Sequence, residues 1–306
     1  MKTLNIITFI LLTYSGLLQA VNERGIYINQ STLENNQKLN KLISESKKTG
    51  ITTFVVDLNK ITRNYQKGIN LIKSNGIKYV ARIVIFPKGG DVQHVRSKAF
   101  WELKYQLVDA AIRFGAQEIQ LDYIRYSTKR RPSAENSKDI LEVIKWYKQK
   151  ISKHNIPMQI DVFGEVSFKP STRIGQNIKL FANSVDVVCP MVYPSHYNPP
   201  RYHSDRPYET IDKSLKAMKR QMNHKMPFKL RPYIEASNYR YSMSFEKRVK
   251  YITAQIKAVE DNNADGWYVW SANNHYDALF QALRNKGSVA VQQYTKTQLG
   301  KQPQAN

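Results

Sequence analysis

Carboxyl side chains stand at the ends of several short apolar segments in this 306-residue chain. They are Asp57, Asp122, Asp161 with Glu165 just beyond it, and Glu235. A carboxyl group in apolar surroundings has a shifted pKa, which suits it to donate or accept a proton or to attack an electrophilic carbon. Two such groups flanking one bond are what hydrolysis of a glycosidic bond requires. The pattern therefore predicts a paired-carboxylate site.

Asp122 is the leading candidate. It follows a short apolar run and precedes aromatic residues and Arg125. A carboxylate there loses solvation unless it is paired, which suits it to act as a nucleophile or base. The alternative is a salt bridge of Asp122 with Arg82 or Arg125 that only holds the rim, and the sequence leaves both open. Asp161 is the candidate acid, with Glu165 in reserve.

Eight short β-rich segments alternate with amphipathic stretches along the chain. The predicted strands cover residues 25–29, 53–58, 79–86, 118–122, 158–163, 185–193, 229–235 and 266–270. This alternation indicates parallel strands joined by crossover helices, and eight units close into a single (β/α)₈ TIM barrel of the α/β class. The alternative is an open doubly wound sheet, but Asn29-Gln30-Ser31 stands where its glycine-rich phosphate loop would be.

In such a barrel the active site lies at the carboxyl ends of the strands. This rule adds substrate-binding candidates near the predicted strand ends, namely Tyr27, Asp57, Arg82, Arg125, Tyr193, His196, Tyr197, Glu235, Trp270 and Asn273. Trp270 is preferred to Trp267 as a sugar platform because it is nearer the carboxyl end of its strand. Asp186 begins a strand, so we expect it on the opposite face in a structural role.

The loop after the sixth predicted strand is rich in His, Tyr and Pro. His196 and His203 are seven residues apart with Asp205 nearby, but a metal site needs three or four converging ligands. We therefore expect no metal, no cofactor, and a loop that contacts sugar rings. Cys189 is the only cysteine, and its apolar neighbours indicate a small buried residue.

Five runs carry a resemblance to a known bacterial family. They are ARIVIF (81–86), QLDYIRY (120–126), DVFG (161–164), PMVYPSHY (190–197) and DGWYVW (265–270). In this order they resemble the glycosyl hydrolase domain family called domain of unknown function 4015, over about residues 24–276. The resemblance implies a barrel related to polysaccharide-cleaving hydrolases, with Asp122 and Asp161 as matching acidic positions.

The chain also departs from the family pattern at three positions. Lys60 stands where the pattern has an acid, Glu165 where it has a non-acidic residue, and Glu235 where it has an amide. These changes alter the charge balance expected in the cleft. They leave open which carboxyl acts as the acid.

The overall charge is strongly basic. Lys plus Arg number 47 and Asp plus Glu number 24, which gives a net charge of +23. Such a surface favours anionic partners such as acidic glycans or a cell envelope. No nucleic-acid motif is present and the basic residues are dispersed, so a specific nucleic-acid partner is not expected.

The two ends of the chain differ from its body. Lys2 and the apolar stretch 4–18, followed by a small residue at Ala20, predict a signal peptide over residues 1–20. An uncleaved anchor is the alternative. We expect a secreted or periplasmic protein with a barrel over residues 21–286. The tail, residues 287–306, has few apolar residues and is predicted to be disordered.

Three functions remain in competition at this level. The first is an exported glycoside hydrolase that cleaves a polysaccharide by paired-carboxylate acid/base chemistry. The second is a non-catalytic barrel that binds glycans or the envelope. The third, ranked last, is a polyanion binder that uses charge alone and ignores Asp122.

Overall fold

The structure, a computed structural model, describes residues 23–299. The predicted signal peptide and the last seven residues of the predicted tail lie outside the described residues. None of the described helices combines the length and the apolar composition needed to cross a membrane.

The core of the fold is a closed ring of parallel strands. They are β1 (Glu23–Ile28), β2 (Thr53–Asp57), β3 (Lys78–Val84), β4 (Glu118–Asp122), β5 (Met158–Phe163), β6 (Val187–Met191), β7 (Lys229–Leu230), β8 (Tyr233–Glu235) and β9 (Gly266–Trp270). The order β5-β4-β3-β2-β1-β9-β8-β6-β7 is closed by a pairing of β5 with β6. The predicted (β/α)₈ barrel is confirmed. The seventh predicted strand is split into β7 and β8 by Arg231 and Pro232.

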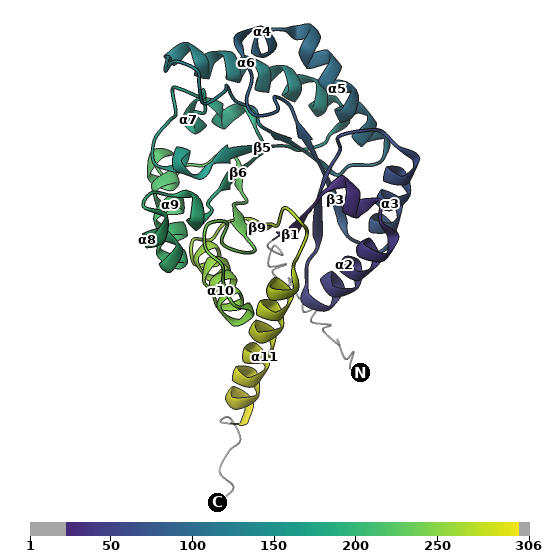
Figure 1. The fold of residues 1–306 in the computed structure, drawn as a ribbon, viewed down its shortest axis with the longest axis vertical. Helices are drawn as coiled ribbons and strands as arrows, with labels where there is room; N and C mark the ends of the chain where they lie inside the picture. The colour runs from purple at the N-terminus through teal and green to yellow at the C-terminus, as the bar shows by residue number, and fades with distance from the viewer. Residues whose placement is uncertain (1–22, 300–306) are drawn as a thin grey trace, which may run out of the picture.

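Helices surround this ring, as Figure 1 shows. They are α1 (Gln30–Leu33), α2 (Asn36–Thr49), α3 (Arg63–Ser74), α4 (Val92–Val95), α5 (Lys98–Arg113), α6 (Ala134–Ile151), α7 (Ile178–Phe181), α8 (Pro200–Asp205), α9 (Pro207–Gln221), α10 (Phe245–Asp261) and α11 (Asp277–Leu299). Short 3₁₀ turns cover Ser152–His154, Gly164–Ser167, Ala182–Ser184 and Pro194–His196. Several helices begin at a polar cap; for example, the Thr62 side chain accepts from the Tyr65 amide.

The buried apolar residues form two separate groups, one outside the ring of strands and one inside it. Most buried apolar residues lie between the strands and the helices, whereas a smaller apolar group, including Tyr233 and Tyr268, fills the barrel itself. Ion pairs occupy the amino-terminal end of the strands: Arg231 lies 2.9 Å from Glu23 and 2.6 Å from Glu118. These buried, paired side chains fill the barrel interior at its amino-terminal end.

The last helix crosses the predicted boundary between the barrel and the tail. It runs from Asp277 to Leu299, past residue 287; the predicted disorder of the tail stays a prediction. In Figure 1 it extends away from the ring of helices. A scarcity of apolar residues argues against packing into a core, whereas helix hydrogen bonds are local and need no such packing.

Candidate active site

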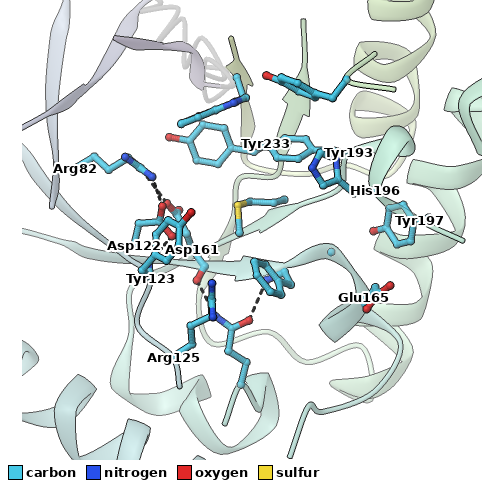
Figure 2. Close-up of a pocket in the computed structure, with 16 residues that line it drawn as sticks. Arg82, Asp122, Tyr123, Arg125, Asp161, Glu165, Tyr193, His196, Tyr197 and Tyr233 are labelled. Atoms are coloured by element: carbon cyan, nitrogen blue, oxygen red, sulfur yellow. Dashed lines mark hydrogen bonds and ion pairs between the residues drawn. The ribbon is translucent and has the colours of Figure 1, made fainter. Parts of the chain in front are cut away.

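A cleft of about 400 Å³ opens at the carboxyl ends of the strands. It is lined by all three candidate catalytic residues and by six of the predicted substrate-binding residues: Asp122, Asp161, Glu165, Arg82, Arg125, Tyr193, His196, Tyr197 and Trp270. Figure 2 shows Arg82 pointing at the two aspartates, with Tyr193 and His196 on another side of the cleft. Parallel strands that end at one rim explain why residues far apart in the sequence meet here.

Arg82 on β3 connects three carboxyl groups. Its guanidinium forms ion pairs with Asp57 at the end of β2 and with Asp122 at the end of β4, and its Nε lies 3.6 Å from Asp161 Oδ2. It also lies 5.2 Å from the ring centre of Trp270. The predicted salt bridge between Asp122 and Arg82 is therefore present, but it lies in the cleft rather than only at its rim.

The two aspartates have different surroundings. Asp122 accepts hydrogen bonds from Arg82 and from the Tyr123 backbone amide, contacts that stabilise a carboxylate. Asp161 is fully buried, and its Oδ1 has no hydrogen-bond partner among the described residues. Burial, and next the negative charge of Asp122, raise the pKa of Asp161 well above its ordinary value, although Arg82 opposes the shift. These surroundings favour the protonated form of Asp161 over the carboxylate.

A sharp turn after β4 shapes this end of the cleft. Tyr123 has φ of 52°, a left-handed conformation that is rare for a residue with a large side chain. The turn brings the Tyr123 amide onto the carboxylate of Asp122. Strained backbone of this kind concentrates at functional sites.

Arg125 is a buried cation without a carboxylate partner within ion-pair distance among residues 23–299. It is 6% exposed and donates one hydrogen bond, from Nη1 to the Tyr126 carbonyl at 2.9 Å. Its guanidinium carbon lies 4.9 Å from the ring centre of Tyr123 and 4.8 Å from that of Phe163. Burial lowers its pKa. The remaining donors are available to a ligand in the cleft.

Four predicted substrate-binding residues do not line the cleft. Tyr27 stacks on Trp270 with ring centres 3.9 Å apart, and its hydroxyl donates to Asp57. Asp57 is buried and forms an ion pair with Arg82, which lines the cleft. These two predictions are corrected because neighbouring side chains cover both residues.

The other two corrections concern loop positions. Asn273 is exposed away from the cleft, and its neighbour Asn274 holds the loop instead by donating to the Tyr27 carbonyl at 3.0 Å. Glu235 is completely buried behind the cleft, where it accepts hydrogen bonds from Ser195 and Tyr251. Position at a strand end is therefore insufficient when the next loop folds over the side chain.

The loop after β6 supplies one wall of the cleft. Tyr193 and His196 are packed edge to face, 5.3 Å apart between ring centres. His203 lies elsewhere, 3.0 Å from Thr210 through Nδ1 and 3.1 Å from the Asn198 carbonyl through Nε2. Among residues 23–299, no group of three or more His, Cys, Asp or Glu residues is placed to hold a metal ion.

Sequence reasoning missed several lining residues: Tyr123, Phe163, Gly164, Gln176, Met191, Tyr233 and Tyr239. Tyr123 and Phe163 adjoin predicted site residues, so strand-end position could have found them. Gln176 and Tyr239 come from loops, where the sequence carries no such signal. Gln176 ties its loop to β5 by accepting from the Phe163 amide at 2.9 Å.

The comparison with known families supplies the identity of the domain. Residues 91–276 match the family described as "Putative glycosyl hydrolase domain", domain of unknown function 4015. The chain belongs to this family. The matched stretch holds both cleft aspartates but not Arg82. No curated protein matches the chain.

Solved structures agree on the fold. The spore cortex-lytic enzyme SleL of Bacillus cereus has a TM-score of 0.61 at 12% identity, over 85% of this chain and 73% of that one. A chitinase from Chromobacterium violaceum has a TM-score of 0.60 at 9% identity, over 85% and 98%. An endo-β-1,4-mannanase from Thermotoga petrophila has a TM-score of 0.59 at 14% identity, over 82% and 68%. At these identities the likeness concerns the barrel alone.

Proposed function

We propose that this chain is an exported glycoside hydrolase that cleaves a polysaccharide with Asp122 and Asp161. Asp122 acts as the nucleophile or base and Asp161 as the acid that protonates the leaving oxygen. The observation that carries the proposal is that both carboxyls line one cleft, where Asp122 is paired with Arg82 and the pKa of Asp161 is raised. Two carboxyls with opposite protonation states are what this chemistry needs. Glu165, exposed at the same cleft, is the reserve acid.

The substrate class follows from the remaining lining residues. The aromatic rings of Trp270, Tyr193 and Tyr239 offer apolar faces for sugar rings. Arg125 has a desolvated positive charge with no carboxylate partner among the described residues, a costly arrangement that an anionic ligand would offset. We therefore favour a glycan that bears a carboxylate or another acidic group near the cleaved bond. The net charge of +23 supports the same preference.

The test compares the wild-type chain, lacking residues 1–20, with Asp122→Asn on a panel of neutral and acidic polysaccharides. Product analysis should show cleavage by wild type and a loss of roughly a thousand-fold or more in Asp122→Asn, because the substituted group contacts the reacting atoms. Asp109→Asn is the matched control, since Asp109 is an exposed aspartate on α5 paired with Arg113. It should cleave like wild type. Cleavage by Asp122→Asn within a few-fold of wild type would exclude this mechanism.

A second candidate is a glycan-binding protein without turnover. The ion pair of Asp122 with Arg82 favours it, because a carboxylate held by a guanidinium is a weaker nucleophile or base. This candidate predicts binding that survives in Asp122→Asn, with no product from either protein on any polysaccharide of the panel. The same experiment therefore separates the two functions.

A further inference from the structure

Glu235 is a buried carboxyl that the proposed chemistry does not use. Its Oε1 accepts hydrogen bonds from the Ser195 amide at 2.9 Å and from the Tyr251 hydroxyl, and its Oε2 lies 2.6 Å from Ser195 Oγ. Burial raises the pKa of Glu235 to about 7, and the hydrogen bonds from Ser195 and Tyr251 limit the rise. The group therefore changes charge near neutral pH while it is sealed from the cleft.

Ser195 connects this carboxyl to the cleft. Ser195 Oγ lies 3.0 Å from Nδ1 of His196, and His196 lines the cleft. No described residue forms a hydrogen bond with Nε2 of His196, which leaves that nitrogen to a ligand. Burial, together with the nearby positive charge of Arg240, lowers the pKa of His196. The ring is therefore neutral at neutral pH and carries one proton, on either Nδ1 or Nε2.

We propose that Glu235 and Ser195 are positioning residues that decide which nitrogen of His196 carries the proton. A serine hydroxyl has a single proton to donate. When Glu235 is ionised, Ser195 donates to it, so Nδ1–H must donate to Ser195 Oγ and Nε2 is a hydrogen-bond acceptor. When Glu235 is protonated on Oε2, it donates to Ser195, Ser195 donates to Nδ1, and Nε2–H is a donor.

The proton count balances across the hydrogen-bonded series Glu235, Ser195 and His196. A proton that arrives at Nε2 from the cleft displaces the Nδ1 proton to Ser195 Oγ, and the Ser195 proton passes to Glu235 Oε2. The ring stays neutral, one proton is gained, and the charge change falls on the buried carboxyl. His196 can thus accept a proton in the cleft without becoming an imidazolium beside the positive charge of Arg240.

Several elements pack against this hydrogen-bonded series and supply the groups that face it. Glu235 on β8 contacts Ser195 from the loop after β6 and Tyr251 from α10. Tyr193 and Tyr239 pack on the His196 ring.

Arg240 is the one cation among these groups, and it is anchored in place. Its Nε donates to the Ser195 carbonyl at 3.0 Å. The tyrosines stay neutral near neutral pH because burial raises the pKa of each. Glu235 is therefore the group whose titration changes the hydrogen bonds of His196.

The role of His196 toward a sugar rests on the proposed function, whereas its tautomer does not. The test is a pH titration of the glycan-free protein with ¹⁵N-labelled histidine, followed by two-bond ¹H–¹⁵N correlation, which distinguishes the two neutral tautomers. The His196 signal is assigned with His196→Gln. We expect the Nε2–H form below about pH 7 and the Nδ1–H form above it, with no imidazolium at the midpoint.

Two variants sharpen this test. Glu235→Gln should lock the Nε2–H form wherever the ring is neutral, because the amide NH₂ donates to Ser195 Oγ and does not titrate. Ser195→Ala should remove the pH dependence of the tautomer, because it breaks the hydrogen-bond connection between Glu235 and His196. Glu142→Gln, which changes an exposed carboxyl on α6, is the control. In this variant the tautomer of His196 should change with pH as it does in wild type.

Either of two results would overturn the proposal. A wild-type His196 that keeps one tautomer across this range overturns the proposal, even if neither variant folds. An unchanged midpoint in a folded Glu235→Gln also overturns it. Neither result bears on cleavage by Asp122 and Asp161, because no substrate is present.

Discussion

At the scale of single residues, burial and neighbouring charge give identical side chains different roles. Asp122 has two hydrogen-bond donors on its carboxylate, whereas Asp161 has a negative neighbour and a buried oxygen that no residue of 23–299 pairs with. Desolvation penalises the charged form, and an adjacent carboxylate adds to the penalty. This difference supports the proposed roles, in which Asp122 attacks or acts as the base and Asp161 donates the proton.

The raised pKa of Asp161 predicts the pH dependence of cleavage. The acid must be protonated, so the rate should fall as pH rises through its raised pKa. Asp161→Asn should lose most of the activity, and on a substrate with a good leaving group, such as a nitrophenyl glycoside, it should retain turnover without this alkaline decline. Initial rates over a pH series measure both. An alkaline decline that persists in Asp161→Asn would assign the acid to another group, with Glu165 the first to examine.

The raised pKa of Asp161 also affects stability. Because its folded pKa lies above the unfolded value, its contribution to stability is complete below the unfolded pKa and is lost as pH rises through the folded pKa. Asn at this position does not titrate. As pH rises from the unfolded to the folded pKa of Asp161, the free energy of unfolding of Asp161→Asn should therefore decline less than that of wild type.

Arg125 predicts the charge preference of the cleft. Arg125→Met keeps an apolar side chain between Tyr123 and Phe163 but removes the charge. We expect cleavage of an acidic polysaccharide to fall by about ten- to a hundred-fold, the scale of a lost charge-assisted hydrogen bond, while a neutral one changes little. Rates on a uronate-containing, a sulfated and a neutral glycan distinguish the sources of the anion. Equal losses on all three would indicate that Arg125 only holds the loop.

At the scale of elements, the closure of the barrel depends on how closely the first and last strands approach. Gly266 pairs with Glu23 where β9 meets β1, and it has φ of 144°. A Cβ at this position would lie 2.2 Å from the Glu23 carbonyl oxygen. Only glycine meets both requirements without strain.

Gly266→Ala should therefore destabilise the barrel. We expect a loss of about 1–3 kcal/mol or more in the free energy of unfolding, from backbone strain and the clash with β1. Gly287→Ala is the matched control, because Gly287 lies in α11 and no atom of the described part of the chain lies within 4 Å of the added Cβ. It should change stability by at most about 1 kcal/mol, toward greater stability. Denaturant unfolding followed by circular dichroism measures both, and equal midpoints for the two variants would contradict the strain argument.

At the scale of the whole molecule, we expect the surface charge to govern adhesion and the cleft to govern cleavage. The net charge of +23 belongs to the entire chain, and much of it lies on exposed helix faces such as Lys41 and Lys48 on α2. Such charges attract anionic surfaces over a distance set by ionic strength, about 30 Å at 0.01 M and about 8 Å at 0.15 M. The proposed adhesion to an anionic envelope would therefore need no specific site.

Adhesion and cleavage should respond differently to salt. Binding of the chain lacking residues 1–20 to an anionic polysaccharide surface should weaken steeply as salt rises, and Asp122→Asn should bind like wild type. Cleavage of a short neutral oligosaccharide should change little with salt and should depend on Asp122. Sedimentation binding assays and product analysis over a salt series measure these. Binding that requires Asp122 would place adhesion in the cleft instead.

The sequence determined the barrel and the meeting of its two acids. Alternating apolar runs and amphipathic stretches define parallel strands, and the ends of neighbouring strands must lie together, so Asp122 and Asp161 converge whatever the loops do. The cysteine was also correctly expected to be buried. These features depend on local periodicity, which a single sequence contains.

Tertiary structure alone decided protonation and access. Tyr27, Asp57 and Glu235 stand at strand ends, yet Trp270 and the loop containing Ser195 keep them out of the cleft. The raised pKa of Asp161 and the connection from Glu235 to His196 arise from desolvation and contacts between residues far apart in the chain. Periodicity places a backbone, whereas the cost of burying a charge depends on every side chain packed around it.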